Sequence, residues 1–174
     1  SLDGAVNVSQ NVTSLGGNIS FSSGGSFTSS GTLQIDAGAG KISVHADSDA
    51  SGSGNFTLGA NNQLLSTNTD DDAVQITAVS MSISGTINSG MGRTNLIPSK
   101  TGQDVVLGAD SGVLGLSSAE LNQITAGSIR VGRLDGTAGT GSINIACSIA
   151  PTGTNTLILL TTGTVFDSST IGIS

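Results

Sequence analysis

Apolar side chains recur along this chain in pairs separated by a single residue, and that intervening residue is usually polar. An alternation of period two over three to five residues predicts a short β-strand with one buried face. Clusters of Gly, Ser, Asn and Asp separate the pairs, and such clusters are typical of turns. The expected inward pairs are Val6/Val8, Ile19/Phe21, Leu33/Ile35, Ile42/Val44, Phe56/Leu58, Val74/Ile76, Met81/Ile83, Val105/Leu107, Ile129/Val131, Ile143/Ile145, Leu157/Leu159 and Ile171/Ile173.

The spacing of these pairs indicates a repeat architecture. The first members of several pairs differ by 23 or 24 in residue number, and the pairs that begin at 129, 143, 157 and 171 follow one another at steps of 14. A fixed period is typical of solenoids, in which each coil packs on the next. We therefore predict one all-β domain over residues 1–174, a parallel β-helix (β-solenoid) of seven to eight coils with about 23 residues each. Positions expected to stack are Ile19 on Ile42, Leu33 on Phe56, and Met81 on Val105 on Ile129.

The alternative all-β architecture is a sandwich of similar short strands. A sandwich commonly carries Trp and Tyr in its core, and this chain contains neither. One segment departs from the strand pattern: Ser117 and Glu120 have the spacing of a capping box, and Leu121 and Ile124 follow at helical spacing. We predict one short helix near 118–125.

Composition and charge exclude several classes of function. Gly, Ser, Thr and Asn make up about half of the chain, and 5 basic residues stand against 12 acidic ones, for a net charge of −7. We therefore expect no nucleic-acid partner, because no basic patch is available to replace counterions. No apolar run is long enough for a transmembrane helix, so we expect no membrane insertion. A glycosidase would need two carboxylates across a cleft, and no such constellation is evident, so we expect no enzyme activity.

Two acidic clusters are the candidate metal ligands. Asp70, Asp71 and Asp72 are consecutive, and carboxylate oxygens are ligands that Ca²⁺ prefers. Asp47 and Asp49 have the spacing that puts two carboxylates on one side of an extended chain. For both clusters the alternative is a solvated turn. Adjacent side chains such as Asp70, Asp71 and Asp72 diverge on an extended segment, and the segment with Asp47 and Asp49 lacks the Gly and the downstream Glu of an EF-hand loop. We expect no cofactor, with structural Ca²⁺ as the one option left open.

Three further features have simpler explanations than a binding site. The lone histidine, His45, follows an inward valine and should point outward. The lone cysteine, Cys147, stands two residues after Ile145 and should be buried. Thr-x-Thr triplets would suit an ice-binding solenoid, but they do not recur at the coil period.

The segment LGLSSAELNQITAGSIRVG (114–132), followed by GSINIACSI and TNTLILLTTGTVFD (154–167), resembles a segment of filamentous-haemagglutinin-like exoproteins, which are very large bacterial surface proteins. The leading half, with GGNISFSSGGSF, TLQIDAGAGKISV and NFTLGANNQLLS, is similar to their β-solenoid repeats. The resemblance implies a right-handed parallel β-helix, secretion, and an adhesive or structural role outside the cell, with no catalytic motif.

The two ends of the chain are in phase with the repeat. If a second copy followed directly, Ile171 would stand nine positions before its Val6, the same step as from Leu33 to Ile42. We therefore expect copies to join end to end into a fibre, as tandem units or as separate subunits. The assembly edges would carry Val6, Val8, Ile171 and Ile173. The expected function is a structural or adhesive unit of a secreted or cell-surface fibre, with surface glycans or a host or neighbouring cell as further partners. The alternatives are a carbohydrate-binding or carbohydrate-active module and, less favoured, an ice-binding solenoid.

Overall fold

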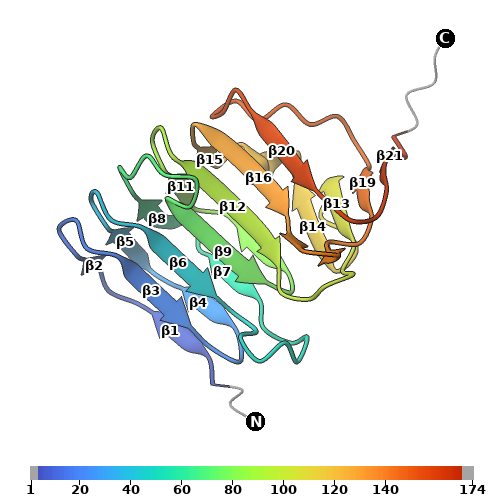
Figure 1. Ribbon diagram of the computed structural model, residues 1–174. Helices are drawn as coiled ribbons and strands as arrows, with labels where there is room; N and C mark the ends of the chain where they lie inside the picture. Colours follow the sequence, from blue (N-terminus) through green and yellow to red (C-terminus); the bar gives the residue numbers. More distant parts are fainter. Residues whose placement is uncertain (1–3, 170–174) are drawn as a thin grey trace.

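The structure is a computed structural model that describes residues 4–169, and its regular secondary structure is almost entirely short parallel strands joined by turns and loops (Figure 1). Most of the chain passes in turn through three sheets, A, B and C, and returns to the first one layer further on. This arrangement is consistent with a parallel β-solenoid. Sheet A contains β1 (Val6–Val8), β4 (Phe27–Ser29), β7 (Phe56–Leu58) and β10 (Met81–Ile83). Sheet B contains β2 (Val12–Thr13), β5 (Thr32–Asp36), β8 (Asn61–Leu65), β11 (Thr86–Asn88) and β15 (Ile124–Thr125).

Sheet C has more strands than any other sheet of the described residues, and a fourth sheet, D, lies beyond the end of sheet A. Sheet C contains β3 (Ile19–Ser22), β6 (Ile42–His45), β9 (Val74–Ala78), β12 (Arg93–Pro98), β16 (Ser128–Gly132) and β20 (Leu157–Leu160). Sheet D contains, in spatial order, β14 (Leu114–Ser117), β13 (Val105–Gly108), β19 (Ile143–Ile145) and β21 (Val165–Asp167). A small antiparallel hairpin joins β17 (Leu134–Asp135) to β18 (Ala138–Gly139).

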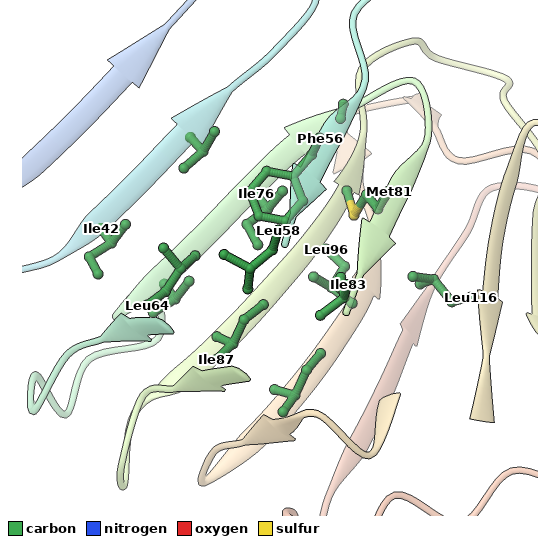
Figure 2. Close-up of a cluster of buried hydrophobic side chains, with 14 of the residues drawn as sticks. Ile42, Phe56, Leu58, Leu64, Ile76, Met81, Ile83, Ile87, Leu96 and Leu116 are labelled. Carbon is green, nitrogen blue, oxygen red and sulfur yellow. The ribbon is translucent and has the colours of Figure 1, made fainter. Parts of the chain in front are cut away.

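The alternation of apolar and polar residues sets which side chains enter the core. Both members of most expected pairs are buried, and the sheets enclose one continuous cluster of them. Figure 2 shows part of this cluster, in which aliphatic side chains from neighbouring sheets, such as Leu58, Ile83 and Leu96, point toward one another. Two of the four phenylalanines, Phe27 and Phe56, stack with ring centroids 5.5 Å apart. The expected pair Ile171/Ile173 lies outside the described residues.

The layers differ in length, and the expected constant period is not confirmed. Ile19 does pair with Ile42, at the expected step of 23 in residue number. Ile42 then pairs with Val74, which is a longer step, because the corners at 46–55 and 66–73 are longer than those before them. The expected stack of Leu33 on Phe56 is wrong, since these residues lie in different sheets. The expected stack of Met81, Val105 and Ile129 is also wrong, because these residues belong to sheets A, D and C, respectively.

The chain order and the spatial order are exchanged once, in sheet D. Strand β13 precedes β14 in the sequence, yet β14 lies next to β10, and β13 lies one position further along the stack. The two strands pair in parallel, Val105 opposite Leu114, through a connection of only the residues 109–113. Parallel neighbours are normally joined by a dozen or more residues. Here the short link is possible because it runs straight back along one strand instead of around the coil.

The expected helix exists but is a single turn, α1 (Ser118–Leu121). Its capping box is confirmed: the Ser117 hydroxyl accepts the Glu120 N–H at 3.2 Å, and the Glu120 carboxylate accepts the Ser117 N–H at 2.9 Å. The same carboxylate also accepts the N–H of Ile83 in β10, at 3.1 Å, and so ties the helix to sheet A. The helix ends early because Ile124 pairs with Ile87 as a strand of sheet B. Within residues 4–169, no helix has the length and apolar character needed to cross a membrane.

Core burial gives the first testable prediction. Replacing Ile42, which is fully buried, with Asp should lower the free energy of unfolding by more than about 3 kcal/mol, because an unpaired carboxylate would enter the apolar core. Urea unfolding followed by circular dichroism measures this loss. The matched control is Ser20→Asp, at an exposed outward position on the neighbouring strand, which should stay within about 0.5 kcal/mol of the parent chain. Equal effects for the two variants would contradict the assignment of inward faces.

Candidate functional site

A hollow on the outer face of sheet C has a volume of about 450 Å³. Its floor is formed by outward side chains of sheet C, including Gln75, Thr77 and Arg130. One side is the loop at 47–50, and the other is the β17–β18 hairpin with the residues before it. A second hollow, which reaches Lys41 and Asp72, meets the first at Gln75. Sheet C therefore presents a trough along its outer face.

Asp47 anchors the loop that forms one side of this hollow. Its side chain is almost fully buried. One carboxylate oxygen accepts hydrogen bonds from the Ser51 hydroxyl at 2.9 Å and from the N–H groups of Gly52 and Ser53 at 2.7 and 3.3 Å. The other oxygen accepts the hydroxyl of Ser99, which follows β12, at 2.6 Å. Asp47 thus ties two distant segments together, and both of its carboxylate oxygens accept hydrogen bonds from the protein.

These hydrogen bonds determine the charge state of Asp47. Burial by itself raises the pKa of the carboxyl group, because it disfavours the charged form. The hydrogen bonds from Ser99, Gly52, Ser51 and Ser53 outweigh burial and hold the pKa below its ordinary value of 3.8. The backbone of Asp47 is in the left-handed region, with φ of 60°, which Asp tolerates better than most residues. The carboxylate is therefore a structural anion.

The other acidic candidates do not converge on an empty site. Asp49, the expected partner of Asp47, is exposed and accepts the N–H of Ser51 at 3.2 Å. Asp70 and Asp72 both pair with the ammonium group of Lys41, at 2.9 and 2.6 Å. The hydrogen bonds that the Lys41 ammonium donates to Asp72 and Asp70 raise the pKa of Lys41.

Asp71, the middle residue of the run Asp70–Asp72, pairs with a cation other than Lys41. Asp71 pairs with Arg93 at 2.9 Å, and its backbone carbonyl accepts the side-chain amide of Asn95 at 2.8 Å. The acidic turn thus folds over the outer face of sheet C and is held there by cations from β12 and from the residue before β6. Within residues 4–169, no group of three or more His, Cys, Asp or Glu side chains is arranged to hold a metal ion.

Arg133 closes the opposite side of the hollow. Its guanidinium donates to the backbone carbonyls of Pro98 and Ser99 at 3.2 and 2.8 Å. It also donates from Nε to the carboxylate of Asp135 at 2.6 Å. These contacts join the β17–β18 hairpin to the end of β12. Both charges of the Arg133–Asp135 pair are used within the protein.

Arg130, in β16, is the cation on the floor of the hollow, and its contacts differ from those of Arg133. Across the described residues it forms no ion pair, and its Nε is buried without a hydrogen-bond partner. Burial and the nearby charge of Arg93 lower the pKa of the guanidinium. Its register neighbour Asn95 is fully buried, and the Oδ1 of Asn95 also lacks a partner. No sequence pattern pointed to Arg130, because outward residues of sheet C are irregularly spaced along the chain.

The expected exposure of the lone histidine is confirmed, whereas the expected burial of the lone cysteine is not. His45 is exposed, as expected, and it lines the hollow. The expectation that Cys147 is buried is wrong, since its side chain is exposed. The chain leaves the strand pattern after Ile145, so the period of two no longer applies at position 147.

The first layer of the stack is the second candidate site. In β1, Val8 is buried and Val6 is partly buried. Strands β1, β2 and β3 stand at the ends of sheets A, B and C, and no other strand within residues 4–169 pairs with their outer edges. The expected partner edge, Ile171 and Ile173, lies outside the described residues.

Asp47 gives a prediction about stability and pH. Its lowered pKa means that it stabilises the fold above about pH 4, and this contribution is lost as the pH falls through the folded-state pKa. Asp47→Asn should reduce the free energy of unfolding by about 1–3 kcal/mol near pH 6, and the gap to the parent chain should narrow near pH 3. Urea unfolding at a series of pH values measures this, with the exposed Asp49→Asn as control. A gap that is the same at both pH values would contradict the assigned role.

The chain matches no family model, no curated protein and no solved structure. The likeness of residues 114–167 to filamentous-haemagglutinin-like proteins therefore stays an expectation from the sequence. Two features of the described residues are open to a partner or a ligand: the first layer and the hollow on sheet C.

Proposed function

We propose that this chain is a structural and adhesive unit of a β-solenoid fibre that is secreted or displayed at a cell surface. Its layers continue in register from one copy to the next. The observation that carries the proposal is the first layer, where three parallel strands, β1, β2 and β3, present outer edges that no strand among the described residues covers. Such edges are templates for pairing with another chain.

The apolar side chains of this layer support the same proposal. Val6, Val12 and Phe21 are only partly buried, although they pack against the core cluster. Residues at equivalent positions one layer inside, such as Phe27 and Ile35, are fully buried. A further layer stacked on the first would remove the remaining apolar surface from water, which favours association. Backbone pairing and apolar burial would thus act together.

The proposed fibre has a defined winding and a defined unit. Its coils wind right-handed, the regular coil has about 23 residues, and the unit comprises seven to eight coils, some with longer corners. The likeness to filamentous-haemagglutinin-like exoproteins supports a bacterial surface setting. Its partners are copies of itself and, for adhesion, glycans of a host or neighbouring cell surface. No enzymatic step, resident cofactor, nucleic acid or membrane insertion is part of this function.

The edge of β1 provides a direct test. Val6 donates its N–H to Ser26 of the next layer at 2.9 Å, and Val8 accepts from Ser30 at 3.0 Å. Because backbone groups alternate along a strand, those of Asn7 face the outer edge. Asn7→Pro removes the outward N–H while leaving the pairing with β4 in place, and proline is tolerated at such edges. We expect it to weaken self-association by about tenfold or more, measured by sedimentation velocity over a range of concentrations.

Asn7→Ala is the matched control, since it truncates the same exposed side chain and keeps the N–H. It should associate like the parent chain. Thermal unfolding of the dilute proteins checks that neither substitution disturbs the fold. A parent chain that stays monomeric at high concentration, or two variants that associate equally, would overturn stacking through this edge.

A further inference from the structure

We propose that the hollow on the outer face of sheet C binds a carboxylate-bearing sugar, such as a uronate residue of an acidic glycan, with Arg130 as the residue that pairs with the carboxylate. The proposal does not depend on stacking through β1. It rests on the charges around the hollow, on its polar and apolar lining, and on its size.

The charges in the hollow leave one cation available. Asp47 is saturated by hydrogen bonds from its own loop and from Ser99. Asp135 is paired with Arg133, which also holds two backbone carbonyls. Arg130 has no such partner among the described residues, and its buried Nε donates to nothing. Because the Nε has almost no exposed surface, a carboxylate in the hollow would pair with the two Nη groups of Arg130.

Two acidic side chains outside the hollow also influence Arg130, and both are paired with other cations. Asp71 pairs with Arg93, and Asp72 pairs with Lys41. Their charges act on Arg130 through space without contact. The hollow is therefore a local site for an anion in a chain whose net charge is −7. A guanidinium prefers a planar carboxylate, which it can bind through two parallel hydrogen bonds.

The remaining lining suits a sugar ring better than a bare anion. Gln75, Ser48 and His45 offer hydrogen-bonding groups, and Ile97, Leu134 and Leu160 offer aliphatic surface. A saccharide presents hydroxyl groups and C–H faces in close succession, so both kinds of lining would be used. The volume of about 450 Å³ lies within the range of small-ligand sites, roughly 300–1,000 Å³. The trough continues toward the second hollow at Gln75, which gives an extended glycan a path along sheet C.

The test uses the whole chain and four probes: sodium glucuronate, glucose, acetate and sulfate. In NMR titrations with ¹⁵N-labelled protein, glucuronate should give saturable shifts in backbone signals of β12, β16 and the 47–53 loop. Glucose and acetate should each bind at least about tenfold more weakly than glucuronate, because glucose lacks the carboxylate and acetate lacks the sugar ring. Sulfate that binds as tightly as glucuronate would show a general anion site and overturn the sugar assignment.

Substitutions test the residue assigned to the carboxylate. Arg130→Gln should weaken glucuronate binding about tenfold or more and leave the weak binding of glucose unchanged. Lys100→Gln is the matched control: it removes the same charge from a side chain that does not line the hollow and that donates to the Ser51 carbonyl. It should stay within about twofold of the parent chain. Arg130→Lys keeps the charge without the forked donor and should be intermediate.

Unchanged glucuronate binding in Arg130→Gln, or an equal loss in Lys100→Gln, would overturn the assignment. The ¹⁵N spectrum and thermal unfolding of each variant establish that it is folded. Sedimentation of the same samples keeps this test separate from self-association, since glucuronate should bind the dilute, unassociated chain as well.

Discussion

Backbone hydrogen bonds between successive layers hold the strands of sheets A, B and C in parallel register. Because of this register, a side chain points inward or outward in the same way as its partner in the neighbouring layer. Ile19, Ile42 and Val74 form one inward row in this way, and Ser20, Ser43 and Gln75 form the outward row beside it. The aliphatic core needs few aromatic rings because each side chain packs on an equivalent one. The hollow on sheet C and the open edge of β1 both follow from this registration.

The local pattern of the sequence predicted the inward faces, while the connections between layers could not be predicted. The alternation around Ile42 or Phe56 depends only on neighbouring residues, and it is confirmed by burial. Which strand lies on which depends on the length of every corner between them. The step from Ile19 to Ile42 is a true layer, but the equal step from Leu33 to Phe56 joins different sheets. Equal spacing alone does not identify a repeat when corners vary.

Little in the sequence indicated the candidate site, because the residues that form it are brought together by corners of unequal length. Gln75, Asn95 and Arg130 are neighbours in the outward row of sheet C, yet they are widely and unequally separated along the chain. The acidic residues attracted attention because they are adjacent in the chain, but Lys41 and Arg93 reach them from other layers and occupy their carboxylates. The sequence singled out Asp47 as a candidate, but it did not indicate the hydrogen bond from Ser99, which belongs to a distant part of the chain.

The exchanged order of β13 and β14 has a consequence for synthesis on the ribosome. A regular stack can grow as the chain emerges, because each new strand lies on one already in place. When β13 emerges, the position beneath it is still empty, since the strand that fills it has not been made. The first four layers can therefore form during translation, whereas the layer containing β14 must wait until the chain has passed Ser117. Growth of this rod is interrupted once, at a place fixed by its topology.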